Sequence, residues 1–277
     1  MQHHARYANR IIARPAWNAL VTITVLGLGS LLDPLQAALQ EDESGGVCAG
    51  RSDVLIGLDN DNLNNPLIQP AGVVANQSLN DTDLLLGGGG CDVLIGLLGS
   101  DVMDGGEGND ILIGGTEQGT TPNSDIMFGG PGADISIWAP GDGSDAFVGG
   151  DGRDAQVFGV IDRDANNVPI LSPVAGRHSR TGLPTAEVTN QGGFCTLERV
   201  PADAELGFEF LVRFFVRATG NLAVTVRLAS DVEQVFCTSV AGGAITFADL
   251  QTANPEFVEL SLAEVQELNR TVAQIIR

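Results

Sequence analysis

The sequence contains no lysine, and all 14 of its basic residues are arginine, against 35 acidic residues. The resulting formal charge of −21 argues against nucleic acids and anionic membrane surfaces as partners, and it favours the binding of cations. Aromatic residues make up only 5% of the chain, whereas glycine occurs 36 times. This balance favours an all-β, turn-rich architecture over a helical one.

The motifs of common hydrolases are also missing. Neither HExxH nor GxSxG occurs, and His178 is the only histidine after the first 38 residues. His178 lies in a polar, arginine-flanked stretch without a defined partner, so we expect it to be a surface residue. We therefore predict that the protein is not an enzyme. A glycosidase-type pair of carboxylates depends on the fold rather than on sequence spacing, so a hydrolase in the C-terminal region stays open.

No apolar run reaches the length of about 20 residues that a transmembrane helix needs. The run Ala19–Leu32 follows three arginines and is followed by small residues. A basic start, a short apolar run and a small-residue exit are typical of a secretory signal peptide, so we expect residues 1–38 to be removed and the protein to be secreted. Leu35 and Gln36 are not small, which leaves an uncleaved anchor as the alternative.

There is no CxxC spacing among the four cysteines Cys48, Cys91, Cys195 and Cys237. Together with the scarcity of histidine, this argues against a zinc site. In an exported chain, an even number of cysteines predicts two disulfides. Three connectivities are possible, and proximity in the sequence favours Cys48–Cys91 and Cys195–Cys237.

What the sequence does contain is a periodic glycine–aspartate repeat. The segments GGGGCDVLI, GLLGSDVMD and GGEGNDILI are followed, after an insertion, by GGPGADISI, PGDGSDAFV and GGDGRDAQV. The recurring aspartates, mostly nine residues apart, are Asp83, Asp92, Asp101, Asp110, Asp125, Asp134, Asp145 and Asp154. Four windows match GGxGxD in full, at 87–92, 105–110, 129–134 and 149–154. A fixed short period of this kind predicts a repeat architecture.

Each repeat contains a turn followed by a short strand. Glycines at the first, second and fourth positions permit a positive φ and a tight turn. The residues after each aspartate are mostly apolar, as in Val93-Leu94-Ile95, and suffice for one short buried strand. Two repeats complete one coil, and coils stack at a strand spacing of about 4.7–4.9 Å. Asp83 and Asp101, or Asp92 and Asp110, should therefore lie above one another.

Stacked carboxylates repel one another unless a cation lies between them. Calcium is suited to this position because it accepts six to eight oxygen ligands, including main-chain carbonyls. The predicted calcium ligands are the eight recurring aspartates, with the turn residues Gly87, Gly89, Gly105, Gly129 and Gly149 and, at the start of the repeats, Asp53. A flexible Gly–Asp linker is the alternative, but a linker does not need apolar triplets in phase with its aspartates.

These motifs resemble the hemolysin-type calcium-binding nonapeptide, or RTX repeat, over residues 48–158 approximately. The resemblance implies a parallel β-roll that binds Ca²⁺ in its Gly/Asp turns. It also marks a departure, because most RTX proteins resemble leaderless cargo exported through a C-terminal signal. We expect the β-roll to span residues 39–158 and a smaller antiparallel β-rich domain with a C-terminal helix to span residues 159–277.

The repeat is irregular in several places. Asp53-Val54-Leu55-Ile56 predicts a first coil, and residues 64–80 form an inserted loop before the main repeats. Further insertions precede Asp125 and Asp145 and make the stacking of Asp110 with Asp134, and of Asp125 with Asp145, less secure. The apolar position two residues after the aspartate is polar at Ser136 and Gln156. Ile135, Ile137 and Val157 are then alternative inward-facing residues.

Beyond residue 160 the glycine–aspartate period ends. We predict strands at Gly193–Val200, Phe208–Ala218, Leu222–Ala229, Glu233–Ser239 and Ala244–Phe247, with a hairpin turn at Thr219-Gly220-Asn221. Ser261 and Glu264 form a capping box that begins a C-terminal helix. Its apolar stripe consists of Leu262, Val265, Leu268, Val272 and Ile276, which we expect to pack on the core.

The sequence thus predicts a secreted, non-enzymatic calcium-binding protein with a structural or interaction role. One alternative is a calcium-dependent adhesin or matrix protein that binds a cell-surface ligand through its C-terminal domain. A hydrolase housed in that domain is the other. After removal of the signal segment we expect no membrane span and no nucleic-acid partner.

Overall fold

The structure is a computed structural model that describes residues 54–56, 73–75, 83–96, 99–115, 124–159, 190–266 and 268. The predicted signal peptide, Cys48, Asp53, His178 and the insertion around residues 116–123 lie outside the described residues. Among the described residues no helix is long and apolar enough to span a membrane.

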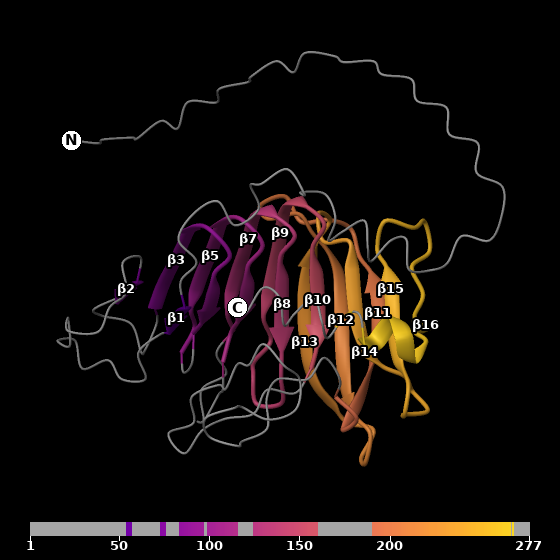
Figure 1. The fold of residues 1–277 in the computed structure, drawn as a ribbon. Helices are drawn as coiled ribbons and strands as arrows, with labels where there is room; N and C mark the ends of the chain where they lie inside the picture. Colours follow the sequence, from indigo (N-terminus) through magenta and orange to yellow (C-terminus); the bar gives the residue numbers. More distant parts are fainter. Residues whose placement is uncertain are drawn as a thin grey trace, which may run out of the picture. The chain divides into compact units, whose positions relative to one another are not determined.

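The repeats form a parallel β-solenoid, as the sequence predicts (Figure 1). One sheet contains β3 (Asp83–Gly89), β5 (Val102–Glu107), β7 (Ile126–Gly132) and β9 (Ala146–Gly152). The other contains β4 (Val93–Ile95), β6 (Ile111–Ile113), β8 (Ile135–Trp138) and β10 (Ala155–Phe158). The chain alternates between the two sheets, so each pair of repeats makes one coil.

Neither insertion changes the register of the stacked strands. Ile111 in β6 pairs with Ile135 in β8, and Ile126 in β7 pairs with Ala146 in β9. At the start of the solenoid, β1 (Val54–Ile56) pairs in parallel with β4, as expected of a preceding coil. A second short strand, β2 (Val73–Ala75), pairs antiparallel with β3 and was not predicted.

The solenoid has two hydrophobic clusters rather than one. The first lies between the sheets and combines Leu85 and Met103 of β3 and β5 with Leu94 and Leu112 of β4 and β6. The second lies on the other face of the β4–β6–β8–β10 sheet and contains Val93, Ile95, Ile111, Ile113, Ile135, Ile137 and Val157. Strands buried on both faces require continuous apolar runs, which explains why whole triplets, and not alternate residues, are apolar.

Ser136 and Gln156 keep the inward position despite their polarity. Ser136 pairs with Leu112, and Gln156 pairs with Ser136, so the register places both side chains in the row of Leu94 and Leu112. Both are fully buried; Ser136 Oγ lies 3.6 Å from Met127 Sδ, and Gln156 Nε2 donates to its neighbour Val157 O. The alternative residues Ile135, Ile137 and Val157 face the second cluster instead.

The C-terminal strands continue both sheets of the solenoid. In one sheet, β11 (Gly193–Arg199), β12 (Phe208–Val216) and β13 (Leu222–Ala229) pair antiparallel, and β13 joins β9 in parallel. In the other, β14 (Gln234–Thr238) lies parallel to β10, followed by antiparallel β15 (Ile245–Asp249) and β16 (Val258–Glu259). In Figure 1 these orange and yellow strands lie beside the magenta ones. The five predicted strands and the hairpin at Gly220, with φ of 70°, are confirmed.

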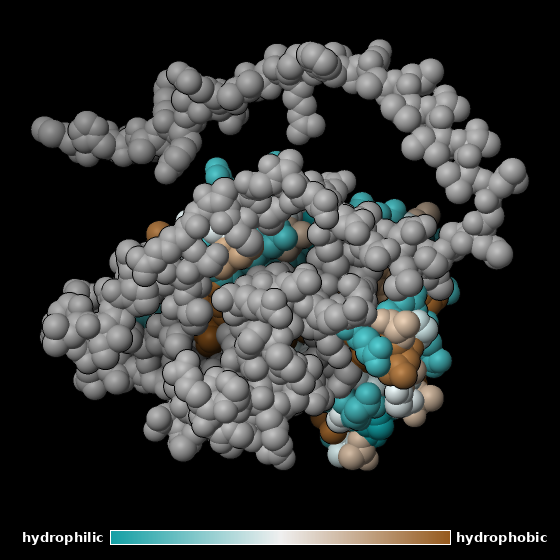
Figure 2. All heavy atoms as spheres, viewed as in Figure 1, coloured by the Kyte–Doolittle hydropathy of each residue, from teal (hydrophilic) through white to brown (hydrophobic). Residues whose placement is uncertain are grey.

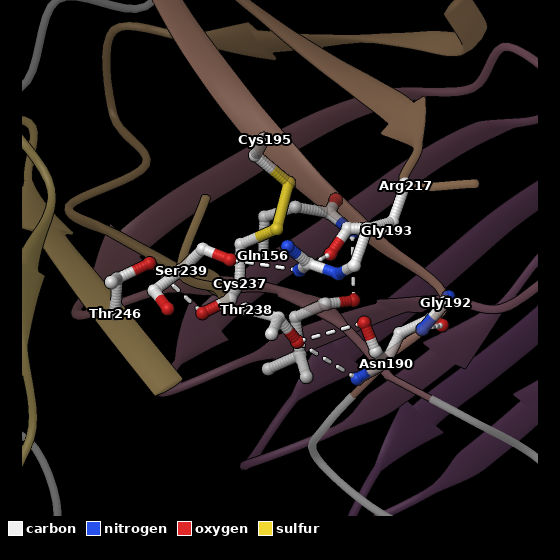
Figure 3. Close-up of a disulfide and its surroundings, with 11 residues drawn as sticks. Gln156, Asn190, Gly192, Gly193, Cys195, Arg217, Cys237, Thr238, Ser239 and Thr246 are labelled. Carbon is white, nitrogen blue, oxygen red and sulfur yellow. Dashed lines mark hydrogen bonds between the residues drawn. A yellow bond between two sulfur atoms is a disulfide. The ribbon is translucent and has the colours of Figure 1, made fainter. Parts of the chain in front are cut away.

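A disulfide connects the two sheets in the C-terminal half (Figure 3). Cys195 of β11 and Cys237 of β14 are bonded, as predicted, and close a 42-residue separation. Beside it, the Arg217 guanidinium donates to carbonyls on both sides of the bond, among them Gly193 O and Ser239 O. The other predicted pair, Cys48–Cys91, stays a prediction because Cys48 lies outside the described residues.

The C-terminal helix begins as predicted but presents its residues differently. Glu264 accepts a hydrogen bond from the Ser261 N–H at 2.7 Å, which confirms the capping box, and Leu268 is buried in the second cluster. Leu262, however, is 74% exposed, so its predicted packing on the core is wrong. Among the residues that are coloured in Figure 2, hydrophobic ones stand beside hydrophilic ones. Val272 and Ile276 lie outside the described residues.

Two turn glycines allow the backbone and packing constraints to be separated. Gly88 and Gly130 have φ of 99° and 107°, but a β-carbon would meet nothing within 4 Å at Gly88 and would lie 2.3 Å from Gly106 O at Gly130. An alanine with a positive φ is strained by roughly 1–3 kcal/mol, so we expect Gly88→Ala to lower the free energy of unfolding by about that amount. Gly130→Ala should lose more than about 3 kcal/mol, because its methyl group clashes with backbone. Guanidinium unfolding followed by circular dichroism measures both, and equal losses would contradict the close stacking of turns.

Candidate metal centre

The recurring aspartates form two columns, one along each edge where the chain enters a strand. Column one consists of Asp83, Asp101, Asp125 and Asp145, and column two of Asp92, Asp110, Asp134 and Asp154. In both columns the backbone N–H of each aspartate except the last donates to the Oδ1 atom of the aspartate in the next coil. The bonds measure 2.7 Å for Asp83–Asp101, Asp92–Asp110 and Asp101–Asp125, 2.8 Å for Asp110–Asp134 and Asp134–Asp154, and 3.1 Å for Asp125–Asp145.

The stacking predicted from the nine-residue period is therefore present, including the pairs across both insertions. All eight aspartates are buried. In Asp110, Asp134 and Asp154 of column two, the second carboxylate oxygen, Oδ2, is also buried and has no hydrogen-bond partner. A buried carboxylate oxygen without a donor is costly, and this makes Oδ2 the place where a cation would be most effective.

The first glycine of each repeat lies against this second oxygen. A β-carbon at Gly105 would lie 2.4 Å from Asp110 Oδ2 and 2.8 Å from the carbonyl oxygen of Gly129 in the next coil. At Gly129 the corresponding distances are 2.4 Å to Asp134 Oδ2 and 2.5 Å to Gly149 O. The missing side chain thus leaves a cradle bordered by one carboxylate oxygen and one main-chain carbonyl oxygen.

Glycine is required at the first position for the space of this cradle and not for a positive φ. Positive φ occurs at the second and fourth positions, as at Gly106 and Gly108, whereas Gly105 does not have it. The expectation that the first glycine supplies a positive φ is therefore wrong; it is needed because a β-carbon would collide with the carboxylate. A β-carbon at Gly89, the third position, would meet only Glu107 O, at 4.0 Å, so Gly89 does not border the cradle.

Burial raises the pKa of the column carboxyls because the charged form loses its hydration. The pKa of Asp110 rises to about 7, that of Asp154 to about 8 and that of Asp134 to about 9, with burial as the largest cause in each. Neighbouring carboxylates raise these pKa values further, and the hydrogen bond from the preceding coil lowers them without offsetting burial. The pKa values of Asp125 and Asp145 are also raised by burial.

The donor atoms at the turns fit calcium. They are carboxylate and carbonyl oxygens, which a hard cation prefers, and the column offers them repeatedly at coil spacing. Within the described residues, no three acidic, thiol or imidazole side chains converge as a metal-binding group. The columns are linear stacks and not cages, so main-chain carbonyls would have to complete any ligand set, as calcium permits.

Two acidic residues near the columns were not predicted as part of the site. Glu233 continues column two, because its Oε2 atom accepts the Asp154 N–H at 2.7 Å. Little in the sequence could have indicated Glu233. It directly precedes the strand Gln234–Thr238, as the repeat aspartates precede theirs, but the glycines of a repeat are missing before it. Asp142 is buried in the turn after β8, where its Oδ2 atom accepts the Ala139 N–H at 2.7 Å.

A comparison of the chain with known protein families, curated proteins and solved structures found no significant match to any of them. The site must therefore be interpreted from its own geometry.

The raised pKa values predict how stability depends on pH when no metal is bound. They lie above the ordinary value of 3.8, so the folded chain holds more protons than the unfolded chain between about pH 4 and pH 9. The stability of the metal-free protein should accordingly be highest at the acidic end and fall as pH rises. We expect Tm in chelator to be higher at about pH 5 than at about pH 9 by 5 °C or more, since 1 kcal/mol shifts Tm by roughly 2–4 °C.

Differential scanning calorimetry in chelator across this pH range measures the effect. Saturating calcium should flatten the dependence, because the metal would replace the protons. A Tm that instead rises with pH would show that the column carboxylates are not buried as described.

Proposed function

We propose that the protein is a secreted calcium-binding protein whose solenoid folds around Ca²⁺ held in its Gly/Asp turns. The observation that carries this proposal is the row of buried, unpartnered Oδ2 atoms on Asp110, Asp134 and Asp154, each facing a glycine cradle. A non-enzymatic structural or interaction role accounts for the columns, because they repeat the same donor set in every coil. The resemblance of the GGxGxD windows to RTX repeats supports the same function.

Metal binding is linked to folding in this proposal. Without a cation, forming the column brings buried carboxylates into a stack that only protonation can neutralise. Calcium binding would replace the protons and stabilise the folded solenoid at neutral pH. Affinities of about 10⁻⁴–10⁻³ M are typical of extracellular calcium modules, and an exported chain would meet calcium in that range. Because each coil stacks on its neighbours, binding should be cooperative.

Asparagine substitutions in column two test the calcium proposal, because their effect on stability should have opposite signs without and with calcium. Asp110→Asn/Asp134→Asn keeps the side-chain volume and the Oδ1 acceptor but removes two buried groups that must either carry a charge or bind a proton. In chelator at about pH 8 we expect the double variant to be more stable than the native protein, because buried unneutralised carboxylates are unfavourable. In millimolar calcium the order should reverse, and the calcium midpoint should shift at least several-fold upward.

Far-UV circular dichroism during calcium titration, with thermal unfolding at each end point, measures both effects. Glu205→Gln/Glu256→Gln is the matched control, because it removes the same charge from two exposed residues and should leave the calcium midpoint unchanged. A native protein that is fully folded in chelator at this pH and binds no calcium would rule the proposal out.

A further inference from the structure

The last repeat turn of the solenoid meets a segment from outside the repeats. In earlier coils the N–H of each column aspartate donates to the next aspartate, but Asp154 N–H donates to Glu233 Oε2 at 2.7 Å, from a residue 79 positions later. In the same turn, Gly149 N–H donates to Asp231 Oδ1 at 3.1 Å, from a residue 82 positions later. The C-terminal segment therefore supplies carboxylates at the point where a further repeat would begin.

The strand register explains how Glu233 reaches this position. Ala155, Gln156 and Val157 of β10 pair with Gln234, Val235 and Phe236 of β14. Glu233 thus precedes β14 as Asp154 precedes β10. The turn that leads to it, Ser230-Asp231-Val232, contains none of the glycines of a repeat.

The oxygen environment of Asp154 differs from that of the internal aspartates. Asp154 is 0% exposed, and its Oδ2 atom has no hydrogen-bond partner. A β-carbon at Gly149 would lie 2.3 Å from this oxygen. No carbonyl of a following glycine is among the atoms nearest to that position, whereas Gly129 has Gly149 O at 2.5 Å. The carboxylate of Asp231, hydrogen-bonded to Gly149, is the oxygen group that the last turn has instead.

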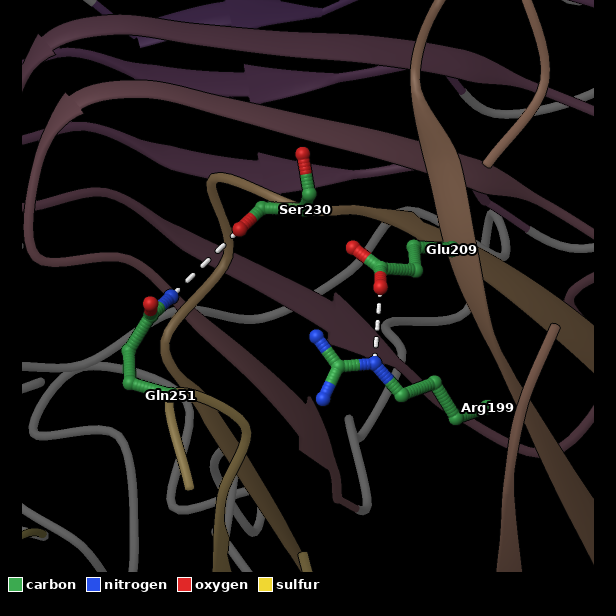
Figure 4. A network of polar contacts seen from close by, with 4 residues as sticks. All are labelled: Arg199, Glu209, Ser230 and Gln251. Atoms are coloured by element: carbon green, nitrogen blue, oxygen red, sulfur yellow. Dashed lines mark hydrogen bonds and ion pairs between the residues drawn. The ribbon is translucent and has the colours of Figure 1, made fainter. Parts of the chain in front are cut away.

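Residues 230–233, which supply these carboxylates, are held by hydrogen bonds from Leu250 and Gln251; Figure 4 shows the bond between Gln251 and Ser230. Gln251 Nε2 lies 3.4 Å from Ser230 O and 3.4 Å from Glu233 Oε1, and the Leu250 N–H donates to Glu233 O at 2.8 Å. Asp231 and Glu233 are only partly buried, so an ion can reach them from solvent.

We infer that Asp231 and Glu233 complete a terminal calcium site with Asp154, and that calcium bound there fastens β13 and β14 to the last coil. The inference rests on the proposed function, since it assigns the same metal to non-repeat ligands. No three acidic side chains of the described residues converge tightly enough to hold a metal alone, so carbonyls of the Gly149–Asp154 turn complete the oxygen set.

Charge supports this assignment. Asp231 and Glu233 accept hydrogen bonds from the repeat turn that ends in Asp154, so three negative charges gather there and repel one another. Arg153, beside Asp154 in the chain, brings one positive charge to the same turn. A divalent ion would relieve the repulsion at the junction through which the C-terminal strands join the solenoid.

Two measurements test this inference: the number of calcium ions bound per chain, and the backbone amides that calcium protects from hydrogen exchange. Isothermal titration with calcium chloride on the full chain gives the stoichiometry of the native protein, of Asp231→Asn/Glu233→Gln and of the control Glu205→Gln/Glu256→Gln. We expect one ion fewer per chain in the first variant only. Hydrogen exchange should show calcium-dependent protection of β13 and β14 that this variant loses, while β3 to β8 keep theirs.

Asp231→Asn alone leaves column two intact and provides the same readout if the double variant does not fold. An unchanged stoichiometry with unchanged protection of β13 and β14 would overturn the inference and leave the repeat sites standing. A native protein that binds no calcium at all would overturn both the inference and the proposed function.

Discussion

The structure depends on one repeated hydrogen bond, from the backbone N–H of an aspartate to the carboxylate of the aspartate in the next coil. The two bonded aspartates are 18, 20 or 24 residues apart, depending on the insertion between them, but the N···O distance stays at 2.7–2.8 Å in column two. The bond therefore holds successive coils at the same spacing whatever the length of the insertion. It also draws the carboxylates out of water. The contact that aligns the coils therefore also buries a stack of carboxylates, whose charged form is unfavourable there.

Several features follow from that conflict. The first glycine of each repeat is needed because the carboxylate occupies the space of a β-carbon, and the unpartnered Oδ2 atoms remain to be neutralised by protons or by a cation. Calcium suits the oxygen-only environment and would make folding depend on the medium. At the end of the stack, Glu233 and Asp231 take the place of a further repeat, and β13 and β14 pair with the last solenoid strands β9 and β10.

Much of this could be predicted from the sequence, because the period of the aspartates dictates the register and the apolar triplets dictate the strands. The disulfide Cys195–Cys237 and the hairpin at Gly220 followed from local signals. The second cluster could not be predicted, since an apolar triplet does not reveal what covers its other face. Glu233 was missed because its partner Asp154 is 79 residues away, and Leu262 because a helical stripe does not show where the core ends.

The most direct test of the central claim is to locate the metal. Crystals grown in millimolar calcium, measured at a long wavelength for calcium anomalous scattering, should show peaks within about 2.3–2.6 Å of the Oδ2 atoms of Asp110, Asp134 and Asp154. Such peaks would establish that the columns are calcium sites. An ordered solenoid from the same crystals with no anomalous density at the turns would contradict the account, because the carboxylates would then be neutralised without metal.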